Sequence, residues 1–156
     1  VSNVRSNASE ALAKIGIGAV PSLIQLLQNE VAHVGTSAAW ALSKIGKDAV
    51  PALVQTLQDP KMGVRRTAAS ILGEIGKDAE DAVPALMLAL QDLDPEVRQY
   101  AAVALGETES EDVVPALIQQ LKDQNPEVRY FVAVALKSIG TPEALNAVKK
   151  HEELQQ

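Results

Sequence analysis

Cysteine is absent from the sequence, and aromatic residues are scarce: the 156 residues include one Trp, two Tyr and one Phe. Without cysteine the chain has no disulfide, no thiolate metal ligand, no iron–sulfur ligand and no cysteine nucleophile. Apolar residues nevertheless make up 47% of the chain, so the core must be built mainly from Ala, Leu, Val and Ile. Such small aliphatic side chains suit helices whose axes pack closely together.

Basic residues are outnumbered by acidic ones, 14 against 20, which gives a formal net charge of −6. Proteins that bind nucleic acid normally present a basic face, so this balance argues against nucleic acid as a partner. The sequence also lacks a run of about 20 apolar residues that could span a membrane, and no N-terminal segment has the pattern of a secretory signal. We therefore predict a cytoplasmic protein with no membrane partner; a mature secreted protein has the same features.

A repeat of 30 to 33 residues runs through nearly the whole chain. Val-Pro pairs begin at positions 20, 50, 83 and 114, and a second anchor valine, usually followed by Arg, stands at 4, 34, 64, 97 and 128. A leucine follows each anchor valine after eight residues, and an Ile-Gly pair ends four of the five units. In the fourth unit Thr108 and Glu109 replace that pair. We predict a single domain over 1–156, with repeats at approximately 1–16 (partial), 17–46, 47–76, 77–109 and 110–140, and a cap at 141–156.

Each unit is predicted to be a pair of helices. The first helix begins at the Val-Pro pair, because proline is tolerated in a first turn. The second helix runs from the anchor valine to the Ile-Gly pair, whose glycine fits a left-handed C-cap. Asp94 and Asn125 have the character of N-caps, with Pro95 and Pro126 at the first helical position. The three additional residues of the 33-residue unit fit a loop at 77–81. The pattern predicts an all-α fold, an α-solenoid of about five helical hairpins.

The two ends of this array differ. The chain opens almost directly into a second-type helix at 4–15, whose apolar side would face an absent neighbour. We expect either a fragment of a longer protein or another chain that covers this end. The segment from Thr141 onward predicts a last helix whose polar C-terminal part, 149–156, is typical of a capping helix.

The pattern Val-Pro-x-Leu, Asp-x-x-Pro-Glu-Val-Arg and Ala-Ala-x-Ala-Leu-Gly-x-Ile-Gly resembles the HEAT-like repeats first recognised in phycobilisome lyases. Residues 83–106 match this pattern most closely, and the resemblance covers roughly 4–150. It implies a right-handed superhelix, with the first helices outside and the second helices lining a concave face. Some relatives handle bilin chromophores or phycobiliproteins, and many are adaptors, so the resemblance is specific for fold rather than for function.

Arginine and aspartate recur in phase with the repeat. The arginines follow the anchor valines, and the aspartates stand in the turns between the two helices, with Asn29 at the equivalent place; these residues are Arg5, Arg65, Arg98 and Arg129, and Asp59, Asp92 and Asp123. We interpret them as a structural ladder, in which each arginine bridges to the turn aspartate of its own or the next repeat. The alternative is a cationic row that binds an anionic ligand. Gly35 interrupts the arginines and is expected to leave Asn29 without its partner.

The positions that vary between repeats point to a binding face. They lie 2, 3, 6 and 10 residues after each anchor valine, between the core positions, and all four aromatic residues fall among them. The fold does not require them, since other repeats carry Ser, Thr or Asn there, and Trp and Tyr are enriched at binding hot spots. The candidate partner-binding residues are Trp40, Tyr100, Tyr130, Phe131, Arg66, Thr36, Ser70, Val103, Val134, Lys44 and Glu107. For Tyr130 and Phe131 the alternative is packing under the capping helix.

Catalytic chemistry has little support in the sequence. The only histidines, His33 and His151, lie far apart in the array, so we predict no catalytic residue, no metal site and no cofactor. HEAT-like di-iron hydroxylases place His-Glu pairs on successive repeats, whereas the only such pair here is His151-Glu152. We expect a non-catalytic scaffold that binds a helix or a face of another protein in a groove about 40 Å long. The alternative is a bilin lyase or lyase-like factor, in which Arg66 and the aromatics hold a tetrapyrrole. Such a factor could be one subunit of a heterodimer.

Overall fold

The computed structural model describes residues 7, 10, 11, 14–28 and 32–154, and every regular element in this part of the chain is a helix. The first helices of the hairpins are α2 (Val20–Gln28), α4 (Val50–Thr56), α6 (Val83–Ala89) and α8 (Val114–Gln120). The second helices are α3 (Ala32–Ile45), α5 (Met62–Ile75), α7 (Pro95–Glu107) and α9 (Pro126–Ile139). Short 3₁₀ helices precede the first helices: η1 (Gly16–Ala19), η2 (Gly46–Ala49), η3 (Gly76–Ala82) and η4 (Glu111–Val113). The last helix is α10 (Pro142–Glu153), and the predicted all-α class is confirmed.

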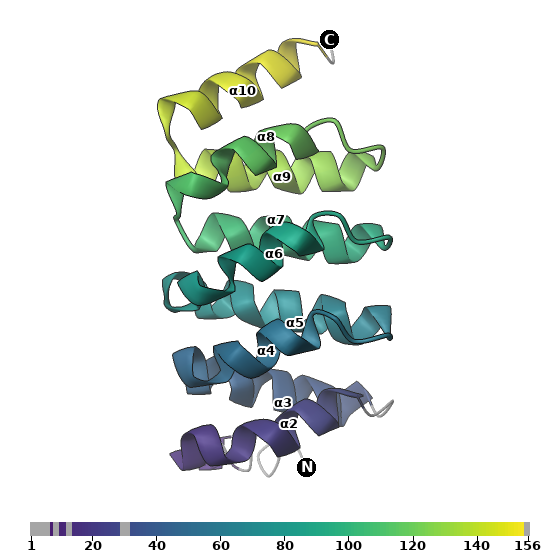
Figure 1. Ribbon diagram of the computed structural model, residues 1–156, viewed down its shortest axis with the longest axis vertical. Coiled ribbons are helices and arrows are strands. Elements are labelled where there is room, and N and C mark those ends of the chain that lie inside the picture. Colours follow the sequence, from purple (N-terminus) through teal and green to yellow (C-terminus); the bar gives the residue numbers. More distant parts are fainter. Residues whose placement is uncertain (1–6, 8–9, 12–13, 29–31, 155–156) are drawn as a thin grey trace.

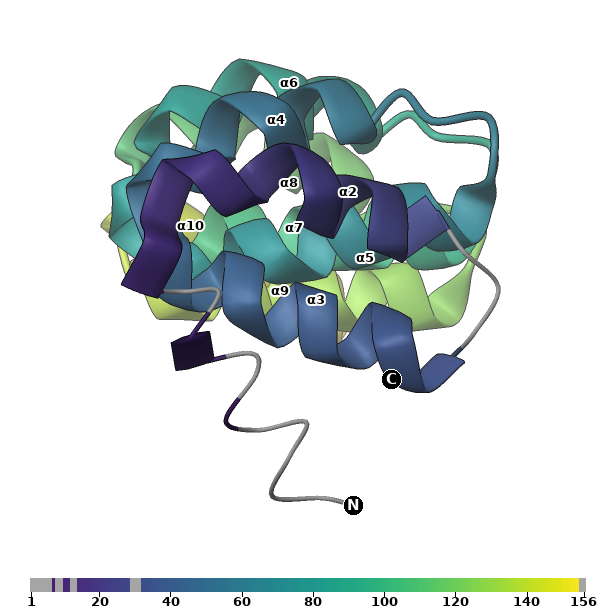
Figure 2. The ribbon, with the colours of Figure 1, turned by 90° about the horizontal axis from the view of Figure 1, so that it is seen from below.

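The hairpins stack in chain order along the long axis of the molecule, from α2 and α3 at one end to α10 at the other (Figure 1). Seen along that axis, the first helices form one layer and the second helices form another (Figure 2). Each second helix packs against the second helix of the next hairpin, and α10 packs against α8 and α9. This arrangement confirms the predicted α-solenoid of helical hairpins. The turns between α4 and α5, between α6 and α7 and between α8 and α9 line up along one edge, on the right in Figure 1.

The predicted N-caps are present in the turns before α7 and α9. The Asp94 carboxylate accepts a hydrogen bond from the backbone N–H of Val97 at 3.1 Å. The Asn125 side-chain oxygen accepts from the N–H groups of Glu127 and Val128 at 2.8 and 3.2 Å. Both helices begin with proline, which has no N–H to leave unsatisfied in the first turn.

The glycines that end the second helices have positive φ, but only part of the predicted C-cap geometry is found. Gly140 is left-handed, with φ of 72°, whereas Gly76 combines φ of 66° with ψ of −129° because the chain turns directly into η3. In the fourth repeat the same place is taken by Glu109, which has φ of 55°. A side chain in this region costs roughly 1 kcal/mol relative to glycine.

The additional residues of the 33-residue unit lie where the sequence predicts them, but they do not form an open loop. They extend η3 to seven residues, against four in η2. Ala79 and Ala82 of this segment are fully buried. The insertion is therefore part of the packed array.

The core consists of aliphatic side chains, as the composition predicts. The leucines that follow the anchor valines, Leu42, Leu72, Leu105 and Leu136, are completely buried. A Cβ atom on Gly106 would lie 2.9 Å from the Cα of Ala135, so α7 and α9 approach more closely there than an alanine would allow. No aromatic side chain is buried in the described residues, although Tyr100 packs against the core from its edge.

Some sequence predictions fall outside the described residues. They include most of the expected opening helix at 4–15 with its apolar side, the arginine at Arg5, the turn residue Asn29 and the side chain of His33. In the ranges that the structure does describe, no helix combines the length and the apolar character needed to cross a membrane.

Candidate functional site

The arginine–aspartate ladder joins successive hairpins along the turn edge. Arg65, in α5, donates from Nε and Nη2 to the two carboxylate oxygens of Asp92, in the next turn, at 2.8 and 2.9 Å. Its Nη1 donates to the backbone carbonyls of Asp59 and Pro60 in its own turn, at 2.9 and 3.2 Å. One guanidinium therefore fixes the turn of its own repeat and holds the turn of the following one.

Arg98 repeats this arrangement one hairpin further along. Its Nε and Nη2 donate to Asp123 at 2.7 and 2.9 Å, and its Nη1 donates to the carbonyls of Asp92 and Leu93 at 2.9 and 3.2 Å. The side chains of this pair are nearly buried, with 9% and 6% of their surfaces exposed. Two-pronged pairs between arginine and carboxylate are among the stronger hydrogen-bonded contacts in proteins.

These contacts change the acidity of the turn aspartates. The hydrogen bond from Arg65 lowers the pKa of Asp92 below its ordinary value, although burial opposes the shift. The hydrogen bond from Arg98 does the same for the pKa of Asp123. Both carboxylates also accept a hydrogen bond from a backbone N–H two residues later, which stabilises the charged form further.

The interruption at Gly35 bears on Asp59, the turn aspartate of the following repeat. Because each arginine reaches the aspartate of the following repeat, the side chain that lacks an arginine in the described ranges is Asp59, while Asn29 lies outside them. Asp59 accepts instead from the Gln28 side-chain amide and from the backbone N–H of Lys61, both at 2.9 Å. A neutral amide thus replaces the guanidinium at this rung.

The candidate partner-binding residues lie on the layer of second helices, and we call this set the second-helix face. It comprises Thr36, Trp40 and Lys44 on α3, Arg66 and Ser70 on α5, Tyr100, Val103 and Glu107 on α7, and Tyr130, Phe131 and Val134 on α9. None of these side chains is buried. The exposed fractions of Trp40, Tyr130 and Val134 are 39%, 65% and 44%. The face is therefore accessible and partly apolar.

Several side chains of this face already contact one another or a neighbour. The Lys44 ammonium lies 5.6 Å from the centre of the Trp40 ring, within the range of a cation–π contact. Tyr130 and Phe131 pack edge to face, with ring centres 5.2 Å apart. Arg66 forms an exposed ion pair with Glu96.

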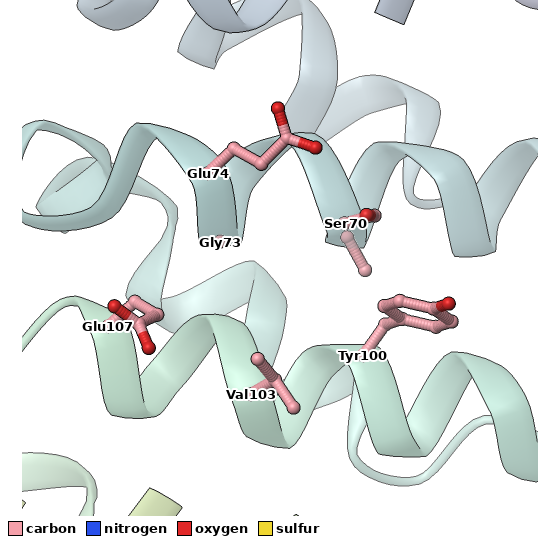
Figure 3. Close-up of a pocket in the computed structure, with 7 residues that line it drawn as sticks. Ser70, Gly73, Glu74, Tyr100, Val103 and Glu107 are labelled. Atoms are coloured by element: carbon pink, nitrogen blue, oxygen red, sulfur yellow. The ribbon is translucent and has the colours of Figure 1, made fainter. Parts of the chain in front are cut away.

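The structure brings four of the candidates together in one pocket between α5 and α7 (Figure 3). The pocket has a volume of about 380 Å³ and is lined by Ala69, Ser70, Gly73, Glu74, Tyr100, Val103 and Glu107. In Figure 3 the Tyr100 ring lies beside Ser70 at one end and Glu107 lies at the other, while the Glu74 side chain extends from α5 away from Glu107. Ser70, Tyr100, Val103 and Glu107 were candidates from the sequence.

Glu74 belongs to the variable positions that the sequence analysis assigned to the binding face, although it was not among the candidate residues. It stands 10 residues after its anchor valine, the same repeat position as Glu107. Among the described residues neither Glu74 nor Glu107 forms a salt bridge.

Tyr130 lies in a second pocket, between α9 and α10. This pocket has a volume of about 340 Å³ and is lined by Pro126, Arg129, Tyr130, Ala133, His151 and Glu152. Since 65% of the Tyr130 surface is exposed, the capping helix does not cover its ring. Trp40 belongs to neither pocket.

Within the described ranges, no three His, Asp or Glu side chains gather in a way that could hold a metal ion. His151, in α10, lines the second pocket beside Glu152, whose carboxylate pairs with Lys137 at 2.7 Å. Both pockets place aromatic, aliphatic and charged groups side by side.

Comparison with known proteins places the repeats in a family. A model of HEAT repeats matches residues 46–92 and 83–152, and a model of the PBS lyase HEAT-like repeat matches residues 4–29. No curated protein sequence matches the chain.

Solved structures share the fold. The complex of CpcE and CpcF of phycocyanin lyase from Nostoc sp. PCC7120 has a TM-score of 0.65 and 23% identity, covering 86% of this chain and 90% of that one. Human deoxyhypusine hydroxylase has a TM-score of 0.65 and 30% identity over 77% of this chain, which spans only 43% of the hydroxylase. A designed armadillo repeat protein in complex with the peptide (KR)4 has a TM-score of 0.59 and 19% identity, covering 96% and 82% of the two chains.

The matched HEAT-repeat segments together run from residue 46 to residue 152, well over half of the chain. They cover the stacked hairpins from η2 to α10. The chain therefore belongs to the HEAT-repeat family.

Proposed function

We propose that this chain is a non-catalytic scaffold that binds a partner protein on its second-helix face. The observation that carries the proposal is the distribution of the aromatic residues. All four lie on this face, at repeat positions where the fold accepts Ser, Thr or Asn, and none is buried. Exposed aromatic and aliphatic groups that the fold does not need are typical of interfaces.

The chemistry of the pocket between α5 and α7 favours a partner that presents a basic residue. Tyr100 and Val103 offer an apolar wall, and Glu107 follows Val103 by four residues, about 6 Å along the helix axis. A lysine or arginine could lay its aliphatic stem on Val103 and bring its charge to Glu107 and Glu74. The designed armadillo repeat protein, which shares the fold, is bound to the basic peptide (KR)4.

Affinity capture with matched variants tests this proposal. The wild type and a Trp40→Ala/Tyr100→Ala double variant are used to recover proteins from the source cell. The control is Leu88→Ala, which removes an apolar side chain that is 73% exposed on the layer of first helices. We expect the wild type and Leu88→Ala to recover the same proteins. The double variant should not recover them, although its own melting temperature is unchanged. Equal recovery by all three proteins would contradict the proposal.

A second candidate function is that of a bilin lyase or lyase-like factor. It is supported by the match of residues 4–29 to the PBS lyase HEAT-like repeat and by the similarity in fold to the phycocyanin lyase complex. Arg66, the residue expected to hold a tetrapyrrole carboxylate, pairs with Glu96, and the nearby pocket carries two further carboxylates. These charges favour a cationic partner over a bilin.

Absorbance spectroscopy separates the two functions. The purified protein is mixed with a free bilin, and the visible band is compared with that of the bilin alone. A red-shifted, sharpened band that disappears in the Trp40→Ala/Tyr100→Ala variant would favour the lyase-like function. The scaffold function predicts an unchanged band.

A further inference from the structure

Two glutamates stand at the C-terminal ends of neighbouring second helices, where the helix dipole disfavours a negative charge. Glu74 precedes the last residue of α5, and Glu107 is the last residue of α7. The carbonyl groups that end a helix carry partial negative charge, so a basic side chain is the favourable choice there. At the same repeat position α3 has Lys44 and α9 has Ser138. The fold therefore does not require a carboxylate at either place.

Both carboxylates also lack a compensating positive charge. In the part of the chain that the structure describes, neither Glu74 nor Glu107 belongs to a salt bridge. By contrast Glu109, only two residues after Glu107, pairs with Lys77 at 2.7 Å. Two uncompensated negative charges thus lie at positions that lower the stability of the free protein, and a cation supplied by another molecule would relieve them.

The pocket beside these carboxylates has the size and the lining for one long basic side chain. Its volume of about 380 Å³ is near the lower end of the range for ligand sites, roughly 300–1,000 Å³. Tyr100 and Val103 provide apolar surface for a side-chain stem, and Glu107 lies at the end opposite Tyr100 (Figure 3). The Glu74 side chain extends away from Glu107, so it adds negative potential rather than a second contact with the same group.

We propose, on the basis of the scaffold function given above, that this pocket binds the side chain of an arginine on the partner protein. The stem lies across Tyr100 and Val103, and the guanidinium pairs with Glu107. Arginine suits these groups better than lysine, because a guanidinium is more weakly hydrated than an ammonium and stacks on aromatic rings. Its paired donors also match the two oxygens of a carboxylate.

A second copy of this chain is a poor source of that arginine. Arg65 and Arg98 each hold a turn aspartate and two backbone carbonyls. Arg129 donates to two carbonyls, and Arg66 pairs with Glu96. All four arginines of the described ranges are thus engaged, whereas a separate protein can present one that is free. The net charge of −6 also favours a basic partner over a second copy.

NMR titration of the full chain with capped tripeptides tests the proposal. The probes carry arginine, lysine or citrulline between two glycines; citrulline has the shape of arginine without its charge. We expect the arginine peptide to shift the methyl resonances of Val103 saturably, with a dissociation constant on the order of 1 mM. The lysine peptide should bind about fivefold more weakly, because one hydrogen bond is lost. The citrulline peptide should bind about tenfold more weakly, because its hydrogen bonds are no longer charge-assisted.

Variants of single carboxylates separate recognition from general attraction and from a structural role. Glu107→Gln should bind the arginine peptide about tenfold more weakly, because the charge-assisted pair is lost. Its melting temperature should nevertheless rise by about 1 to 3 °C, since an unfavourable charge is removed from the helix end. Glu74→Gln should weaken binding only about twofold, through the reduced potential. Amide spectra establish that each variant is folded.

The matched control is Glu127→Gln. It removes an exposed carboxylate from the first turn of α9, outside the pocket. A negative charge is favourable at that end of a helix, so the melting temperature should fall slightly while binding of the arginine peptide stays unchanged. A loss of binding equal to that of Glu107→Gln would reduce the effect to net charge and would overturn the proposal.

Three further results would overturn it. They are Val103 methyl resonances that do not shift with the arginine peptide, equal affinity for the arginine peptide and either of the other two, and unchanged binding by Glu107→Gln. A lower melting temperature of Glu107→Gln would also contradict it, because the carboxylate would then have a structural role.

Affinity capture distinguishes this proposal from the scaffold function on which it rests. If Glu107→Gln still recovers the proteins that the Trp40→Ala/Tyr100→Ala variant loses, the arginine pocket is refuted and the scaffold function stands. Equal recovery by the wild type and the double variant refutes the scaffold function, whatever the peptides do.

Discussion

Arg98 and Asp123 join two successive hairpins through two parallel hydrogen bonds of 2.7 and 2.9 Å, at a site where both side chains are nearly excluded from water. The same guanidinium holds the carbonyls of the turn before it. The contact therefore fixes the spacing between repeats and the shape of a turn at once.

Replacing Arg98 by alanine should destabilise the protein strongly. The substitution leaves the Asp123 carboxylate desolvated without its partner, a change that costs about 3 kcal/mol in comparable buried pairs. Urea unfolding at pH 7 measures the loss. The matched control is Arg66→Ala, whose pair with Glu96 is about half exposed and should contribute less than about 1 kcal/mol. Equal losses in the two variants would contradict a structural role for the ladder.

Acid should weaken the same contacts. Folding lowers the pKa of Asp92 and Asp123, chiefly through the hydrogen bonds from Arg65 and Arg98. The unfolded chain therefore binds protons at a higher pH than the folded one, and stability from these pairs is fully present above the unfolded pKa of about 3.9. It is lost as the pH falls through the lower folded pKa values. The urea midpoint, measured between pH 7 and pH 2, should decrease as the pH is lowered below about 4, and it should decrease less steeply in Asp123→Asn. A wild-type midpoint that stays level to pH 2 would be inconsistent with the pairs.

The close approach of α7 and α9 at Gly106 should not tolerate a methyl group. Gly106→Ala places a Cβ 2.9 Å from both Cα and Cβ of Ala135, and overpacking of this kind costs about 2 kcal/mol. Gly63→Ala is the control, because a Cβ there meets nothing within 4 Å. In a helix it should stabilise by about 0.5 kcal/mol. Thermal unfolding of the two variants should therefore shift in opposite directions; a shift in the same direction would show that the helices can separate freely.

Glycine at position 109 should stabilise the protein. Glu109 has φ of 55° at the place where other repeats have glycine, so Glu109→Gly should relieve roughly 1 kcal/mol of backbone strain. The change also removes the exposed ion pair with Lys77, whose contribution is small. Glu109→Ala removes that pair but keeps a Cβ, and it isolates the backbone effect. If the alanine variant unfolds at the same urea concentration as the glycine variant, strain at this position is negligible.

The helices and their N-caps could be predicted because local chemistry determines them. Proline at the first helical position, Asp94 and Asn125 before it, and the phase of the valines and leucines all act within a few residues. The direction of the ladder could not be predicted in this way. An arginine next to the anchor valine can reach the turn of its own repeat or the next one, and only the stacking of the hairpins selects the second aspartate.

The pocket beside Tyr100 also depends on stacking. Ser70 and Glu74 lie on α5 and Tyr100, Val103 and Glu107 lie on α7, and their meeting follows from the close packing of the two helices. The repeat phase could place each residue on the face but could not show that these neighbours enclose one space. The η3 segment shows the same limit, since Ala79 and Ala82 are buried by tertiary contacts although their sequence is typical of a loop.

Photo-crosslinking tests the central claim, that the second-helix face binds a partner, most directly. A photoreactive amino acid is placed at Ser70, inside the pocket, and in a separate variant at Leu88, on the layer of first helices. After irradiation in the source cell, the crosslinked products are resolved by mass. We expect a discrete protein adduct from position 70 that is absent from position 88 and is lost when Trp40→Ala and Tyr100→Ala are added. An adduct from position 88 alone, or one from position 70 that survives both substitutions, would contradict the account.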